Sequence, residues 1–109
     1  MDTQPFQIVL TNCPDSDSAN TIAYGLVNEG LAACVNILPA GYSVYHWQGK
    51  VETAREHILL VKSHIQHYQV IEERIRALHP YELPAIVAVP IVNGLTEYLA
   101  WIADPRKTT

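Results

Sequence analysis

Several features that mark other protein classes are missing from this chain of 109 residues. It has two cysteines, too few for a disulfide framework, so reduced thiols in a cytoplasmic protein are expected. No apolar run reaches the roughly 18 residues of a membrane span, and residues 1–4 lack the basic segment of a signal peptide. The sequence has no Ser-His-Asp set, Gly-rich phosphate loop, zinc-ligand motif or close carboxylate pair, so an enzyme is not expected.

Positive charge is also scarce. Seven Lys and Arg residues stand against eleven Asp and Glu residues, which gives a net charge of −4 with His neutral. No basic block is available to release counterions from a phosphate backbone, so nucleic acid is not an expected partner. The composition is 49% hydrophobic and 17% charged, which is typical of a folded chain. This length predicts a single domain over residues 1–109.

Strand-like and helix-like patterns alternate along the chain. Four segments have strand patterns: residues 6–11, 31–47 (interrupted at Pro39 and Gly41), 50–62 and 85–91. Apolar residues at helical spacing form three stripes: Ala19, Ile22, Ala23, Leu26 and Val27; Tyr68, Ile71, Ile75 and Leu78; Leu95, Tyr98, Leu99 and Ile102. The order βαββαβ with an extra C-terminal helix predicts an α+β, ferredoxin-like sheet with helices on one face.

The ends of the helices carry recognisable signals. Asp15 or Ser16 can cap the first helix, and Gly30 can end it in the left-handed conformation. Ser63 and Gln66 have the spacing of a capping box, which predicts the start of the second helix at this point.

Three further residues are predicted to lie in packed positions. Cys34 falls within a strand pattern and is expected to be a small core residue. Tyr98 and Trp101 of the last helix are expected to pack over the sheet edge or a neighbouring subunit.

The second and third strand patterns predict a long hairpin that turns at Gln48-Gly49. Its arms exceed the usual length of about 5–6 residues. This turn would place His46 opposite Val51, so His46 and His57 cannot meet within one subunit. The far end carries apolar surface that another subunit is expected to cover: Tyr42, Val44, Tyr45, Trp47 and Val51.

The segment between the second helix and the last strand reads His79-Pro80-Tyr81-Glu82-Leu83-Pro84. Its two prolines hold the backbone extended and end the preceding helix. An imidazole, a phenol and a carboxylate lie between them, and all three can bind a metal or a ligand. Two interpretations stay open: a rigid binding loop, or a plain connection with polar groups at its surface.

Four segments together resemble the CutA divalent-cation tolerance family: Cys13-Pro14-Asp15; Leu31-Ala32-Ala33-Cys34-Val35-Asn36-Ile37; Tyr45-His46-Trp47-Gln48-Gly49-Lys50; and the His79–Pro84 segment followed by Tyr98-Leu99-Ala100-Trp101. The resemblance runs from about residue 8 to residue 102. It implies a ferredoxin-like subunit, a homotrimer similar to the PII signalling proteins and a cytoplasmic setting. It also implies binding of copper or other divalent metals and a contribution to the response to metal ions.

The resemblance points to Cys13 and His79 as metal ligands. Cys13 is expected at the turn after the first strand, before a helix N-terminus whose dipole favours a thiolate. The residue before His79 is Leu78, where the family has a second histidine. Because strands one and four run antiparallel, the two ligands are expected at opposite ends of the sheet, and a shared site would need ligands from another subunit.

The resemblance also indicates residues of a cleft between subunits: Trp47, Glu56, Lys62, Tyr81 and Glu82. Such a set suits a small polar ligand; alternatively, its members form salt bridges and hydrogen bonds that hold the trimer. Two functional hypotheses follow. One is a metal-tolerance trimer, and the other is a PII-like sensor or scaffold that binds a small ligand or a protein in these clefts.

Overall fold

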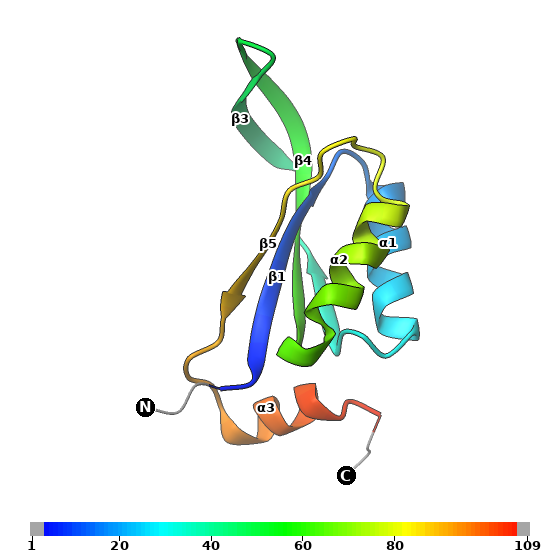
Figure 1. Ribbon diagram of the computed structural model, residues 1–109, viewed down its shortest axis with the longest axis vertical. Helices are drawn as coiled ribbons and strands as arrows, with labels where there is room; N and C mark the ends of the chain where they lie inside the picture. The colour runs from blue at the N-terminus through cyan, green and yellow to red at the C-terminus, as the bar shows by residue number, and fades with distance from the viewer. Residues whose placement is uncertain (1–3, 107–109) are drawn as a thin grey trace.

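The computed structural model describes residues 4–106 and contains one antiparallel sheet with three α-helices (Figure 1). The elements follow the chain in this order: β1 (Phe6–Cys13), α1 (Ser16–Asn28), β2 (Cys34–Ile37), β3 (Gly41–Trp47), β4 (Lys50–His64), the 3₁₀ turn η1 (Ile65–His67), α2 (Tyr68–Leu78), β5 (Ile86–Pro90) and α3 (Thr96–Ala103). No helix of this part of the chain is both long and apolar enough to cross a membrane. The ends of the predicted domain, residues 1–3 and 107–109, lie outside the described residues.

The strands run in the order β2-β4-β1-β5, and β3 pairs with the outer part of β4. Every pairing is antiparallel, with Val9 opposite Val61 on one side of β1 and opposite Ala88 on the other. Helices α1 and α2 lie on the same face of the sheet (Figure 1). This is the ferredoxin-like βαββαβ arrangement that the sequence predicts, followed by the extra helix α3.

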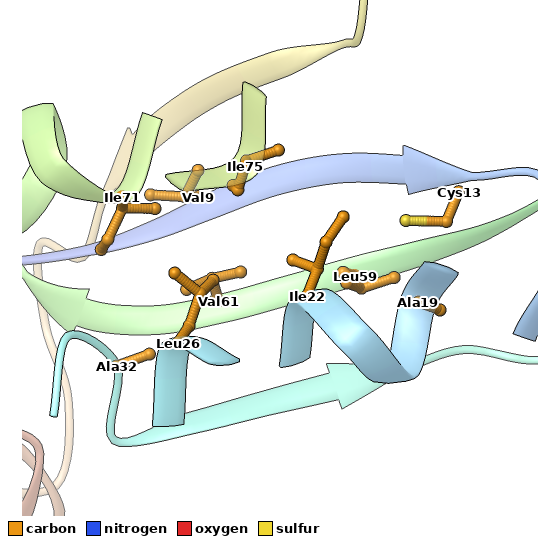
Figure 2. Packing of buried hydrophobic residues seen from close by; sticks show 10 residues of the cluster. All are labelled: Val9, Cys13, Ala19, Ile22, Leu26, Ala32, Leu59, Val61, Ile71 and Ile75. Atoms are coloured by element: carbon orange, nitrogen blue, oxygen red, sulfur yellow. The ribbon is translucent and has the colours of Figure 1, made fainter. Parts of the chain in front are cut away.

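The main core lies between this sheet and the two helices (Figure 2). It consists of Val9, Cys13, Ala19, Ile22, Leu26, Ala32, Leu59, Val61, Ile71 and Ile75. Burying a side chain such as Ile22 or Leu59 contributes roughly 1.5–3 kcal/mol, so these contacts fix α1 and α2 against the strands.

Two of the residues predicted to pack in α3 are half-exposed in the single chain. Tyr98 and Trp101 are 37% and 38% exposed, and their rings contact each other with centroids 5.5 Å apart. The residues of α3 that pack inward are Leu99 and Ile102, which join Phe6 in a second small cluster. Tyr98 does contact the sheet of its own subunit, because Nζ of Lys62 on β4 lies 5.4 Å from the centroid of its ring, whereas packing of either aromatic on a neighbouring subunit stays a prediction.

Cys34 is also less buried than the sequence predicts. It lies at the start of the edge strand β2, opposite Lys62, and is half-buried. Its Sγ lies 3.8 Å from Oδ1 of Asn36. The prediction of a core position was wrong because Cys34 lies on the face of the sheet that Lys62 shares, whereas Val35, opposite the buried Val61, is the residue of β2 that packs against the core.

Both signals for the ends of α1 are confirmed. Asp15 is the N-cap, and its Oδ1 accepts a hydrogen bond of 2.7 Å from the backbone N–H of Ser18. This bond lowers the pKa of the Asp15 carboxyl group below its ordinary value. After the helix, Gly30 has φ +75°, a conformation that glycine adopts without steric cost.

The capping box predicted at Ser63 is wrong. Strand β4 continues to His64, and the buried hydroxyl of Ser63 instead accepts a hydrogen bond of 3.2 Å from Nε2 of Gln7 on β1. The cap comes from His64, whose Nδ1 accepts from the backbone N–H of Gln66 at 3.1 Å. A short 3₁₀ turn then precedes α2.

Strands β3 and β4 extend beyond the body of the molecule as a two-stranded ribbon (Figure 1). Gln48 and Gly49 form its turn with φ values of 51° and 79°, as a two-residue hairpin turn requires. His46 lies opposite Val51, which confirms the predicted register. In the ribbon the exposed fraction is 83% for Tyr42 and 69% for Val44. The prediction that another subunit covers this surface requires such exposure in the single chain.

Candidate functional site

Three segments meet where the ribbon leaves the body: the end of β1, the middle of β4 and the segment 79–85 that leads into β5. In Figure 1 this last segment, drawn in yellow, passes beside the end of β1. Cys13 pairs with His57 of β4, and Thr11 pairs with Ile86, the first residue of β5. The prediction that Cys13 and His79 lie at opposite ends of the sheet is wrong, because antiparallel pairing puts the end of β1 beside the start of β5. Cys13 and His79 therefore lie at the same end of the sheet.

His79 is buried and uses both of its ring nitrogens. Its Nδ1 accepts a hydrogen bond of 3.1 Å from the backbone N–H of Tyr81, and its Nε2 lies 2.6 Å from the carbonyl oxygen of Asn12. A nitrogen that accepts an N–H carries no proton, so the proton is on Nε2 and is donated to Asn12. His79 thus links the loop before β5 to the end of β1.

Cys13 is the last residue of β1 and is fully buried. The prediction that it lies in the turn after this strand is therefore wrong. Figure 2 shows its sulfur directed toward the other core side chains. Burial raises the pKa of the Cys13 thiol to about 11, against a weaker opposing hydrogen bond from Ser18. The thiol is therefore protonated near neutral pH, and the thiolate expected from the helix dipole does not form in this state because desolvation outweighs the dipole.

Glu56 is the most buried carboxylate of this region, with 7% of its surface exposed. Its Oε2 accepts a hydrogen bond of 2.8 Å from the hydroxyl of Tyr81, and its Oε1 accepts one of 3.4 Å from Nδ2 of Asn12. Both donors are neutral groups. Burial and the bond to Glu56 raise the pKa of the Tyr81 phenol well above its ordinary value, so the phenol remains a donor.

A groove of about 800 Å³ opens beside Glu56, a volume suited to a small ligand. Its lining comprises Asn12, Ser43, Tyr45, His46, Trp47, Glu56, Pro80, Tyr81, Glu82, Leu83, Pro84, Ala85, Ile86 and Val87. Four of the five predicted cleft residues are therefore brought together within one chain. The fifth, Lys62, lies elsewhere: its Nζ donates to the hydroxyl of Tyr98 at 3.3 Å.

Asn12 and Tyr45 line the groove but were not among the predicted site residues. Tyr45 could have been found from strand alternation, since Ser43, Tyr45 and Trp47 are two residues apart and therefore share one face of β3. Asn12 gave no such signal. Its role depends on the pairing of β1 with β4, which brings its amide to Glu56 over 44 positions of sequence.

Within residues 4–106, no group of three or more His, Cys, Asp and Glu side chains is arranged to hold a metal ion. The possible metal ligands of this region are instead divided between the core and the groove. Cys13 faces the core under α1, whereas Glu56 lines the groove. A metal bound by Cys13 and His79 would need further ligands from water or from another subunit.

The sequence pattern of the CutA1 divalent ion tolerance protein family matches residues 7–105. The chain is 48% identical over 98 residues to the divalent-cation tolerance protein CutA of Thermus thermophilus, covering 90% of this chain and 95% of that protein. A solved structure of the divalent cation tolerance protein CutA1 from Thermus thermophilus matches with a TM-score of 0.89, covering 91% of this chain and 96% of the other. CutA from Xylella fastidiosa matches with a TM-score of 0.88 at 47% identity, covering 90% and 94% of the two chains.

Relatives from plants and vertebrates are longer. The chain spans 59% of a chloroplastic CutA protein from Oryza sativa, at 37% identity, and covers 96% of its own length. It spans 61% of a CutA homologue from Xenopus laevis, at 40% identity over 84% of this chain. The pattern match over nearly the whole chain and the identities above 30% confirm the resemblance seen in the sequence, and the chain belongs to the CutA1 divalent ion tolerance family.

Proposed function

We propose that this chain contributes to divalent-cation tolerance by binding a metal ion, with no catalytic step. Its relatives in bacteria carry this role in their names, and the family pattern extends over residues 7–105. One observation supports the proposal most: the structure brings the buried thiol of Cys13 and the imidazole of His79 to the same end of the sheet. A thiolate and an imidazole suit copper and other soft or borderline ions better than carboxylates alone.

Binding at Cys13 and His79 requires two changes in the protomer. The thiol must lose its proton, and Nδ1 of His79 must exchange the N–H of Tyr81 for the metal. Metal uptake would then release a proton and free the segment 79–85 to move. This coupling offers a route by which a bound ion could alter the neighbouring groove.

Calorimetry with Cu(I) under anaerobic conditions tests the assignment. We expect binding to the native chain and at least about a tenfold loss of affinity in Cys13→Ser and in His79→Ala. Cys34→Ser and His67→Ala are the matched controls and should keep the native affinity, because both residues lie outside this end of the sheet. Equal affinity in all five proteins would rule out the assigned site.

We also propose that the chain acts as a PII-like homotrimer in the cytoplasm. The exposed apolar side chains of the ribbon support assembly, because surface of this kind is normally covered. The two free thiols fit a reducing compartment. Related proteins are described as periplasmic in Archaeoglobus fulgidus and as chloroplastic in plants, so fractionation of cells is the measurement that decides the compartment.

A second candidate function is a sensor or scaffold in which the groove beside Glu56 takes a small ligand or a segment of another protein. The observation that favours it is the gathering of Trp47, Glu56, Tyr81 and Glu82 around one cavity of about 800 Å³. In the proposed trimer a neighbouring subunit would close this groove. A screen of small molecules by thermal shift on the purified protein tests this function independently of metal.

A further inference from the structure

Among the described residues, 4–106, the charge of Glu56 lacks an ionic partner. Its carboxylate is 7% exposed, and the hydrogen bonds that it accepts come from the neutral side chains of Asn12 and Tyr81. The only ion pair within residues 4–106 joins Arg74 and Glu29 on the helices. Burying a charge is costly unless an opposite charge is close, so a cation beside Glu56 would be stabilised strongly.

The groove supplies a matching surface for the rest of such a ligand. Three aromatic side chains line it, from Tyr45, Trp47 and Tyr81, and aromatic faces attract cations. Tyr45 and Trp47 are each 41% exposed in the single chain, so in the proposed trimer they would form the wall of the cleft that a neighbouring subunit closes. The remaining lining is mostly apolar: Pro80, Leu83, Pro84, Ala85, Ile86 and Val87.

The lining also excludes other classes of ligand. It contains a second carboxylate, Glu82, and neither Lys nor Arg, so an anion would meet two carboxylates with His46 as the single lining side chain able to carry positive charge. A bare divalent ion would find too few ligands, because Ca²⁺ needs about 6–8 oxygens and residues 4–106 hold no three-donor cluster. A neutral ligand would leave the buried carboxylate without a counter-charge.

From these observations we propose that the groove binds a small organic ammonium ion, with its charged nitrogen at the carboxylate of Glu56 and its apolar body against Tyr45, Trp47 and Tyr81. A carboxylate has about four lone-pair sites, and two are used by Asn12 and Tyr81, so it can still accept from an N–H of the ammonium group. The proposal rests on the second candidate function, for which it names the class of ligand. It is independent of metal at Cys13 and His79.

Three probes of similar shape and different charge test it: 2-phenylethylammonium, neutral 2-phenylethanol and anionic 3-phenylpropionate. Trp101→Phe leaves Trp47 as the single tryptophan, so its fluorescence reports on the groove. We expect the ammonium probe to bind at least about tenfold more tightly than the alcohol, and the anion to bind most weakly. Glu56→Gln should abolish this preference, whereas Glu97→Gln, an exposed carboxylate of α3, should keep it.

A preference for the alcohol or the anion, or an unchanged ammonium affinity in Glu56→Gln, would overturn the proposal. If Glu56→Gln does not fold, the comparison of the three probes on the unmodified groove decides alone. Trp47→Leu, followed by calorimetry, should weaken ammonium binding by severalfold through loss of the aromatic wall. If none of the probes binds, both this proposal and the small-ligand form of the second candidate function fail. The titration with Cu(I) tests metal binding at Cys13 and His79 separately.

Discussion

The phenol of Tyr81 donates a hydrogen bond of 2.8 Å to Oε2 of Glu56, and this bond ties the loop before β5 to strand β4. The same loop is held to β1 through His79, whose ring lies 2.6 Å from the carbonyl oxygen of Asn12. Asn12 in turn donates to Oε1 of Glu56. These contacts form a closed circuit that fixes the wall of the groove.

Removing the Tyr81 hydroxyl tests the strength of this circuit. Tyr81→Phe should lower the free energy of unfolding by about 1–3 kcal/mol, because the buried carboxylate loses its shorter hydrogen bond. Urea denaturation measures the effect. The control is Tyr68→Phe, which removes a hydroxyl bonded to Glu72 on a more exposed helix surface and should cost less than about 1 kcal/mol. Equal costs in the two variants would mean that Glu56 does not depend on Tyr81.

Cys13 should make stability depend on pH in alkaline solution. Burial raises the pKa of its thiol from 9.0 to about 11, so the folded state binds the proton more tightly than the unfolded state. The resulting stabilisation is complete below pH 9 and disappears between pH 9 and 11, with a loss of about 2 kcal/mol. Urea titrations across this range should show the loss in the native chain and in Cys34→Ala, but not in Cys13→Ala.

Tyr81 changes stability in the same direction at still higher pH, since its pKa is also raised. It is present in all three proteins, so the difference between them isolates Cys13. A loss in Cys13→Ala as steep as in the native chain would contradict a buried, protonated thiol.

The ribbon formed by β3 and β4 should be an assembly surface. Light scattering at micromolar concentration should give a mass near three times the 12.2 kDa of one chain. Val44→Lys, on the ribbon, should lower this mass, because it would place a charge in the covered surface. Tyr24→Lys is the control, since Tyr24 is 68% exposed on the outer side of α1. A monomeric native chain would remove the trimer and every ligand site that depends on a second subunit.

Local signals predicted much of the fold. The periodicity gave the order of strands and helices, and Asp15 and Gly30 were found because their roles depend on near neighbours in the sequence. The register of the hairpin followed from the two-residue turn at Gln48 and Gly49. Each of these features is set by short-range geometry.

The errors concern contacts between distant parts of the chain. Ser63 resembles a cap, but its hydroxyl bonds to Gln7, 56 positions away. Within the chain Lys62 bonds to Tyr98 and not to Glu56, and its place in a cleft between subunits stays a prediction. Likewise, the burial of Cys13 depends on how α1 packs over the end of β1, which the sequence alone does not specify.

The most direct test of metal binding at Cys13 and His79 uses Co(II), a redox-stable substitute whose bond to a thiolate produces a charge-transfer absorption band. We predict that this band develops when Co(II) is added to the native chain, and that more than one pH unit of acidification suppresses it, since metal and proton compete for the thiol. The band should persist in Cys34→Ser and be lost in Cys13→Ser. A band that survives in Cys13→Ser, or none in the native chain under conditions where Co(II) binds, would contradict the account.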